Sequence, residues 1–192
     1  MPISKLSGSF RRNKRGFTLF EIVIVMGIMA VLSSMMLGYS QRNSKQILLA
    51  TTQAKLASIF ARAKFLSIQS FFYVGDQSDD VICGHGVYVD VDDESVVIFQ
   101  DLIPAGSLCS DDPEEYTYDS GDRILTGELN QLHLSGKEVE VKTADSEYVI
   151  FIPPEPIVRF DNSNTNESSV VITDGDADIG VTITQDGQIR MD

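Results

Sequence analysis

Glu21 is a carboxylate inside a run of apolar side chains that extends from Phe17 to Leu37. An ionised carboxylate in hydrocarbon costs at least ~2.5–3.5 kcal/mol on insertion. Two interpretations account for its presence. The residue lies at the fifth position of the run, so it can reach the headgroup layer of a bilayer as an ordinary interfacial acid. Alternatively, it pairs with a positive group that meets it inside the apolar region.

A positive partner arises if the chain is cut after Gly16, because the cut frees the α-amino group of Phe17. Gly16 has no Cβ, which lets a protease approach the backbone closely. In a helix that begins near Phe17, this amine and Glu21 are about one turn apart. If the helices of neighbouring chains are staggered, each Glu21 can also meet the amine of a neighbour. The spacing therefore predicts a carboxylate whose partner is made by processing.

The apolar run is long enough for a membrane-spanning helix. At ~1.5 Å per residue, its 21 residues span a hydrocarbon core of ~30 Å. Residues 1–16 contain five cations and no acid, so the positive-inside rule keeps the N-terminus in the cytoplasm and exports the rest. A cleavable secretory signal is the rival interpretation, but its apolar core is shorter and ends in a small-residue cleavage site. No A-x-A pattern follows this run.

The letters K-R-G-F-T-L-F-E at residues 14–21, followed by the apolar run, resemble the cleavage and methylation signature of type IV prepilins and type II secretion pseudopilins. The resemblance covers roughly residues 11–38. It implies that a prepilin peptidase cuts between Gly16 and Phe17 on the cytoplasmic side, that Phe17 is N-methylated, and that Glu21 guides assembly. The implied partners are this peptidase and methyltransferase, other pilin or pseudopilin subunits, an inner-membrane assembly platform and the lipid bilayer. The implied location is the inner membrane, with a single pass, and then a pilus or pseudopilus.

The helical pattern continues beyond the membrane-length run. No proline or glycine interrupts residues 39–74, and Gly75 with Asp76 ends the pattern. We therefore predict one long helix from about Phe17 to Phe72, whose second half packs an apolar stripe on a sheet. The residues of this stripe are spaced three, four or seven apart. They are Leu49, Leu56, Ile59, Phe60, Ala63 and Leu66.

After residue 80 the chain changes to short runs in which Val, Ile, Thr and Tyr alternate with polar residues, the pattern of consecutive antiparallel strands. The acidic stretch 101–122 is expected to be an irregular loop. We predict a pilin-like α+β fold, with the long N-terminal helix packed on an antiparallel β-sheet or β-sandwich head. The predicted strands are Gly86–Asp92, Ser95–Gln100, Glu138–Lys142, Tyr148–Pro153, Ile157–Asp161, Ser169–Thr173, Gly180–Thr184 and Gln188–Met191.

These patterns divide the chain into four segments. Residues 1–16 are a cytoplasmic leader that is cleaved, and residues 17–38 are a transmembrane and filament-core helix. Residues 39–74 are the amphipathic continuation of this helix, and residues 75–192 are an acidic, exported, β-rich head.

The charge of the chain is distributed unevenly. The net charge is −13, yet residues 76–192 contain 27 acids against five cations. Such a head repels a phosphate backbone, so nucleic-acid binding is disfavoured there. It can attract divalent cations or a basic partner surface, or it can simply be a soluble acidic surface.

Three segments together resemble the GspH/FimT group of minor pseudopilins and minor pilins, which have a helix against a β-sandwich. They are the end of the predicted helix, ARAKFLSIQS at residues 61–70, then CGHGVYVDVDDESVVIFQD at residues 83–101, and the late run IVRFDNSN…SSVVIT…IGVTITQDGQI at residues 157–189. Some members of that group bind DNA during transformation through a basic C-terminal region. In this chain the last thirty residues contain one cation, Arg190, against five aspartates. The resemblance therefore implies a minor structural subunit, with a DNA-uptake pilin as the alternative that a basic stripe on the head would favour.

The two cysteines, Cys83 and Cys109, both lie in the predicted exported part, where a disulfide can form and persist. Their one possible intrachain pairing closes a loop of about 26 residues, and loop-closure entropy assigns it roughly 3–4 kcal/mol. The alternative is that both are unpaired small hydrophobic residues. A zinc site is not expected, because His85 and His133 are too few to complete its ligands.

The sequence also bears on a calcium site and on a catalytic site. Asp174, Asp176 and Asp178 alternate like the opening of an EF-hand calcium loop. Ile179 then stands where that loop requires glycine and Gln185 where it requires glutamate, so a solvated turn between strands is the preferred interpretation. For catalysis, the sequence has no nucleophile motif and no phosphate-binding glycine loop. No cofactor and no enzymatic activity are expected, although a membrane-anchored hydrolase would be supported by a cleft with convergent catalytic groups.

Overall fold

The computed structural model describes residues 18–72, 81–103, 108–109, 116–134, 138–154, 157–161 and 165–192, without the side chains of residues 37–43, 71 and 72. The chain divides into two compact units, Met1–Asn43 and Ser44–Asp192. The helix α1 spans Leu19–Phe72 and therefore contributes to both. Its described extent agrees with the predicted helix from Phe17 to Phe72, and the predicted stop at Gly75 and Asp76 lies outside the described residues.

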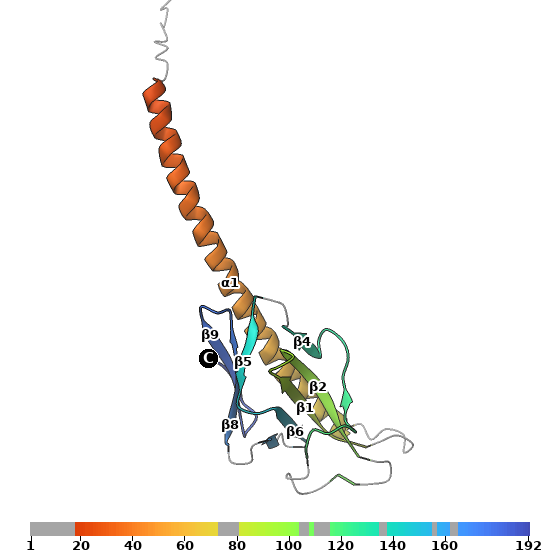
Figure 1. The fold of residues 1–192 in the computed structure, drawn as a ribbon. Helices are drawn as coiled ribbons and strands as arrows, with labels where there is room; N and C mark the ends of the chain where they lie inside the picture. The colour runs from red at the N-terminus through yellow and green to blue at the C-terminus, as the bar shows by residue number, and fades with distance from the viewer. Residues whose placement is uncertain are drawn as a thin grey trace, which may run out of the picture. The chain divides into compact units, whose positions relative to one another are not determined.

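In the second unit the described strands form two antiparallel sheets (Figure 1). The larger sheet has the order β3-β2-β1-β6-β7, and β4 also pairs with β2. Its strands are β1 (Val81–Asp90), β2 (Ser95–Ile103), β3 (Arg123–Ile124), β4 (Gln131–His133), β6 (Tyr148–Ile152) and β7 (Ile157–Phe160). The smaller sheet has the order β10-β9-β8-β5. Its strands are β5 (Glu140–Ala144), β8 (Glu167–Thr173), β9 (Asp178–Thr184) and β10 (Ile189–Met191).

The main core lies where the second half of α1 meets both sheets. The predicted stripe of the helix is confirmed: five of its residues are buried in this core, and Leu66 packs against it partly buried. Valine, isoleucine and phenylalanine from alternate positions of the strands fill the sheet side, as expected for a half-buried antiparallel sheet. They include Val87, Ile98, Val149 and Phe151 of the larger sheet and Val141, Val170, Ile172, Val181 and Ile183 of the smaller one. The α+β class predicted from the sequence is thus confirmed.

A second cluster covers the opposite face of the larger sheet. It contains Cys83, Phe99, Tyr116, Ile150 and Ile152 as buried residues. Close packing here depends on Gly86 of β1, because a Cβ at this position would lie 2.3 Å from the ring of Phe99 and 2.9 Å from the carbonyl oxygen of Val149. We call this side of the larger sheet its outer face.

The eight predicted strands all have counterparts in the structure, but three details are corrected. Strand β1 begins at Val81, earlier than predicted, because its Gly-His-Gly centre interrupts the alternation while the ladder with β2 continues. Strand β2 continues to Ile103, into the stretch expected to be loop. The two- and three-residue strands β3 and β4 were not predicted, since runs this short have no periodicity of their own and exist through pairing with β2.

Candidate assembly site

The first turn of α1 holds Glu21 through a helix cap. The backbone N–H of Glu21 donates to the side-chain hydroxyl of Thr18 at 3.3 Å and to its carbonyl oxygen at 3.1 Å. Thr18 thus occupies the N-cap position, and Glu21 is the third residue of the helix, the Thr-x-x-Glu spacing of a capping box. A carboxylate in the first turn is also stabilised by the helix dipole. The sequence contained this spacing, although the cap was not predicted from it.

Glu21 is the acid of an otherwise apolar and uncovered helical segment. The segment Leu19–Met36 has a mean hydropathy of 2.2, and none of it is buried within the chain. Leu19 is 81% exposed and Phe20 is 73% exposed. By length and composition this segment can cross a membrane once. Bare apolar surface of this extent is unfavourable in water, so it requires lipid or other apolar helices around it.

Gly16 and Phe17, the predicted cleavage and methylation residues, lie outside the described residues. Cleavage, methylation and the pairing of Glu21 with the new amine therefore stay predictions. The structure contributes the position of Glu21, in the first turn of the helix and close to the predicted cut.

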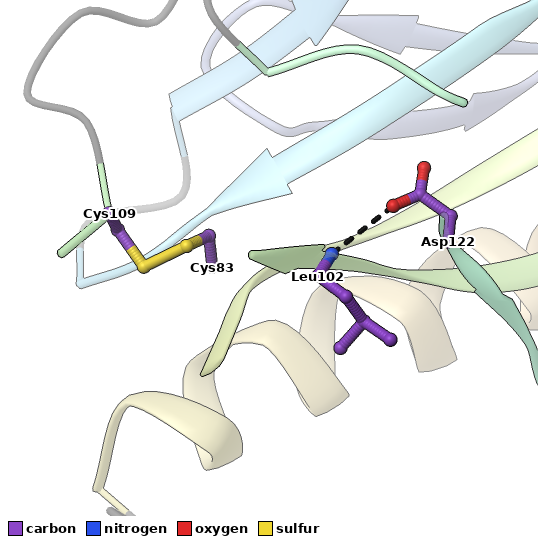
Figure 2. The surroundings of a disulfide bond; sticks show 4 residues. All are labelled: Cys83, Leu102, Cys109 and Asp122. Carbon is purple, nitrogen blue, oxygen red and sulfur yellow. Dashed lines mark hydrogen bonds between the residues drawn. A yellow bond between two sulfur atoms is a disulfide. The ribbon is translucent and has the colours of Figure 1, made fainter. Parts of the chain in front are cut away.

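The two cysteines are joined in the structure. Cys83 of β1 and Cys109 form a disulfide with their Cα atoms 5.4 Å apart and a sequence separation of 26 (Figure 2). Both belong to the cluster on the outer face of the larger sheet. The bond therefore ties the segment around Cys109 to this face.

The three aspartates considered for calcium have separate partners. Asp174 accepts the backbone N–H groups of Asp176 and Ala177 at 3.0 and 2.8 Å, which shapes the turn between β8 and β9. Its pKa is lowered, chiefly by these two bonds. The side chain of Asp176 lies 3.8 Å from the Lys45 ammonium, and Asp178 pairs with Lys142. Within the described residues no group of three or more potential ligands converges on one point.

Two surface hollows of the described head bear on the question of catalysis. One, of about 410 Å³, is lined by five carboxylates besides Tyr88, and the other, of about 660 Å³, includes Ser58 and His133. The Ser58 hydroxyl donates to the carbonyl of Lys55 at 2.7 Å, and Nε2 of His133 contacts the Gln131 side chain at 3.4 Å. The Ser58 hydroxyl proton is thus donated within its own helix. The expectation that the chain is not an enzyme stays a prediction.

The comparisons bear first on the N-terminus. Residues 11–37 match the family model described as the prokaryotic N-terminal methylation motif, which confirms the resemblance predicted from the letters around Gly16. The chain is also similar to a solved structure, the minor pseudopilin EpsH from the Type 2 Secretion System of Vibrio cholerae. The identity is 14% and the TM-score 0.44, and the similarity covers 74% of this chain and 94% of that chain. The comparison with curated proteins gave no match.

Proposed function

We propose that the protein is a structural subunit of a type IV pilus or a type II secretion pseudopilus. It is inserted as a prepilin, cut after Gly16, methylated at Phe17 and assembled through the segment Leu19–Met36. The observation that carries the proposal is the position of Glu21: one carboxylate in the first turn of an uncovered apolar helix, within the residues that match the methylation motif. The resemblance of the helix end and head segments to the GspH/FimT group supports the role of a minor component.

The proposed partners follow from this role. A prepilin peptidase and methyltransferase process the N-terminus on the cytoplasmic side, and an inner-membrane platform passes the subunit from the bilayer into the filament. Other pilin or pseudopilin subunits then surround the apolar helix in place of lipid. In that setting the amine made by the cut and a neighbour's Glu21 neutralise each other, which removes the cost of a lone carboxylate among apolar side chains.

Glu21 can serve as part of the helix cap or as a charged docking group, and one substitution distinguishes these two roles. The Glu21→Gln variant keeps the side-chain shape and the capping-box residue type, which can be Glu or Gln, but removes the charge. If charge pairing guides assembly, we expect this variant to insert into the membrane normally and to fall at least about tenfold in filament content. Quantitative mass spectrometry of filaments sheared from the native cell measures this content, with Ser34→Ala in the same segment as the matched control.

Filament content of Glu21→Gln equal to that of the unchanged chain would remove the docking role and leave only the helix cap. The same spectra report the N-terminal peptide. A methylated Phe17 terminus on the dominant filament protein indicates a major subunit, and the same terminus at trace level indicates a minor one. Processed protein found only in the membrane indicates a short secretion pseudopilus, and an uncut leader in all fractions contradicts the proposal.

A further inference from the structure

Asp101 and Asp122 stand opposite each other at the edge of the larger sheet. The register of β2 with β3 pairs Phe99 with Ile124 and Gln100 with Arg123. The next position of the same antiparallel ladder places Asp122 across from Asp101. Asp101 is 9% exposed, and it shares a face of β2 with Phe99, because alternate residues of a strand point to the same side. A buried carboxylate therefore faces a second carboxylate on the outer face of the sheet.

Asp122 belongs to a segment that packs over this outer face. We call residues 116–124 the strap. The ring of Tyr118 in the strap stacks on Tyr88 of β1, with centroids 4.4 Å apart, and is tilted against Phe99 at 4.7 Å. Tyr116 is 5% exposed and joins the same cluster. The strap therefore shields the aromatic residues of the outer face from water.

The carboxylate of Asp122 fastens the strap to β2. One of its oxygens accepts the backbone N–H of Leu102 at 3.1 Å, as Figure 2 shows. The other accepts the N–H of Asp119 at 2.9 Å, and Asp119 in turn accepts the N–H of Gly121 at 2.6 Å. The fastening thus depends on the Asp122 carboxylate lying beside Leu102, the residue that follows Asp101.

The charges around Asp101 favour its neutral form. Burial, together with the charges of Asp122 and Asp119, raises the pKa of Asp101 to about 7. Burial also raises the pKa of Asp122, while its two backbone hydrogen bonds act in the opposite direction.

The remaining described neighbours do not neutralise Asp101. Besides Asp119 and Asp122, the strap packs Tyr116 and Tyr118 on this face, and β1 places the uncharged Gly84 opposite Asp101. Arg123 is exposed and pairs across the ladder with Gln100, at a position whose side chain points to the other face from that of Asp101. Two like charges directly opposite in a ladder destabilise it.

We propose that the strap is a proton-controlled latch, closed while Asp101 is protonated against the Asp122 carboxylate and released when Asp101 loses this proton to water. Released, the strap frees the edge of β2 that β3 occupies and uncovers Tyr88 and Phe99. The disulfide from Cys83 to Cys109 keeps the chain that leads into the strap attached to β1, so the opening is local and reversible.

Amide hydrogen exchange of the full chain in detergent micelles tests the latch. We compare the unchanged chain with Asp101→Asn at pH 5.5 and 8.5, because comparison at one pH cancels the intrinsic exchange rate. For the amides of Leu102, Asp119 and Ile124 we take, at each pH, the ratio of the exchange rate in the unchanged chain to that in Asp101→Asn. We expect this ratio to rise at least about tenfold from pH 5.5 to 8.5, because the opening constant increases up to tenfold per pH unit between the pKa of an exposed Asp, ~3.9, and the raised pKa of Asp101 in the closed strap, about 7, and is constant at higher pH.

Asp92→Asn, in the exposed turn between β1 and β2, is the matched control and should follow the unchanged chain at both values of pH. The proposal is overturned if the ratio of the exchange rates in the unchanged chain and in Asp101→Asn is the same at pH 5.5 and 8.5. A change that affects the amides of β8 and β9 equally also overturns it, since that indicates global and not local opening. If Asp101→Asn does not fold, the test uses the unchanged chain alone and compares the exchange rates of the strap amides with those of the β8 amides. A ratio of these two rates that stays constant from pH 5.5 to 8.5 overturns the latch.

Discussion

At the residue scale, each buried polar group loses its hydration when the chain folds, and the rest of the fold must offset this free-energy cost. His85 of β1 is 3% exposed and lies in contact with the Gln100 side chain, 3.2 Å from its amide nitrogen. Its Nδ1 is buried and has no hydrogen-bond partner among the described residues. Burial lowers the pKa of His85 to about 4, because the imidazolium form would lose its hydration. His85 is therefore a neutral, structural histidine.

This burial predicts a specific acid sensitivity. An unfolded chain binds a proton at His85 below pH ~6.5, whereas the folded chain binds it only near pH 4. The stability of the fold therefore falls as the pH drops from about 6.5 to about 4, by roughly 3 kcal/mol in total from this residue. We expect His85→Gln to lose less stability than the unchanged chain between pH 7 and 4.5, measured by denaturant unfolding with near-ultraviolet circular dichroism.

His133→Gln in β4 is the control, because this histidine is also in a strand but is exposed. It should match the unchanged chain at both values of pH. An equal loss of stability in all three proteins would show that His85 does not contribute to the acid sensitivity.

At the element scale, the larger sheet has two covered faces that are stabilised by different means. Its inner face packs on α1 with a contiguous apolar core. Its outer face is covered by short segments with few apolar residues, and a disulfide and the Asp122 carboxylate fasten them. Where a segment buries little apolar area, it needs such fastenings to offset the entropy of ordering its chain.

The disulfide is expected to matter for the outer face more than for the inner one. Loop closure over 26 residues predicts that reduction lowers the free energy of unfolding by roughly 3–4 kcal/mol. The denaturation midpoint of the full chain with and without reductant measures this loss. A Cys83→Ala, Cys109→Ala double variant should not respond to reductant. A reduction effect below about 0.5 kcal/mol would contradict the prediction.

At the scale of the whole molecule, charge distinguishes the N-terminal segments from the acidic head. The head carries 27 acids against five cations in residues 76–192. Cations of the second half of α1 are used within the same unit: Lys64 donates to the carbonyl of Gly187 at 2.9 Å, and Arg62 to the side chain of Asn130 at 2.7 Å. Through these hydrogen bonds the helix contacts the strand-bearing part of the chain, and both side chains already donate to groups of the protein.

This distribution predicts that the protein does not bind duplex DNA. Non-specific DNA binding needs several Lys or Arg contacts and gives Kd values of ~10⁻⁴–10⁻⁶ M at physiological salt. We expect no binding of the full chain to labelled duplex DNA up to about 100 μM protein at about 150 mM salt. Binding that weakens with added salt would contradict this and would favour the DNA-uptake alternative.

The sequence by itself determined the parts of this protein that depend on local order. The long helix follows from an unbroken stretch and a periodic stripe, and Glu21 is recognised by its place after Gly16 and Phe17. Eight strands follow from alternation, and the cysteine pair follows from count alone. For the helix, Glu21 and the strands, neighbouring residues in the chain contain the whole signal. The cysteine pair is 26 residues apart, and only the total of two cysteines in the chain identifies it.

The tertiary structure alone decided the parts that depend on pairing between distant segments. Strands β3 and β4 exist only through their ladders with β2. The burial of His85 depends on the helix and strands that cover it. Asp101 is one of 28 acids in the sequence, and nothing near it in the chain distinguishes it. It becomes a candidate switch because the β2–β3 register brings Asp122 opposite and because the strap excludes water, and both depend on which segments the folded chain places side by side.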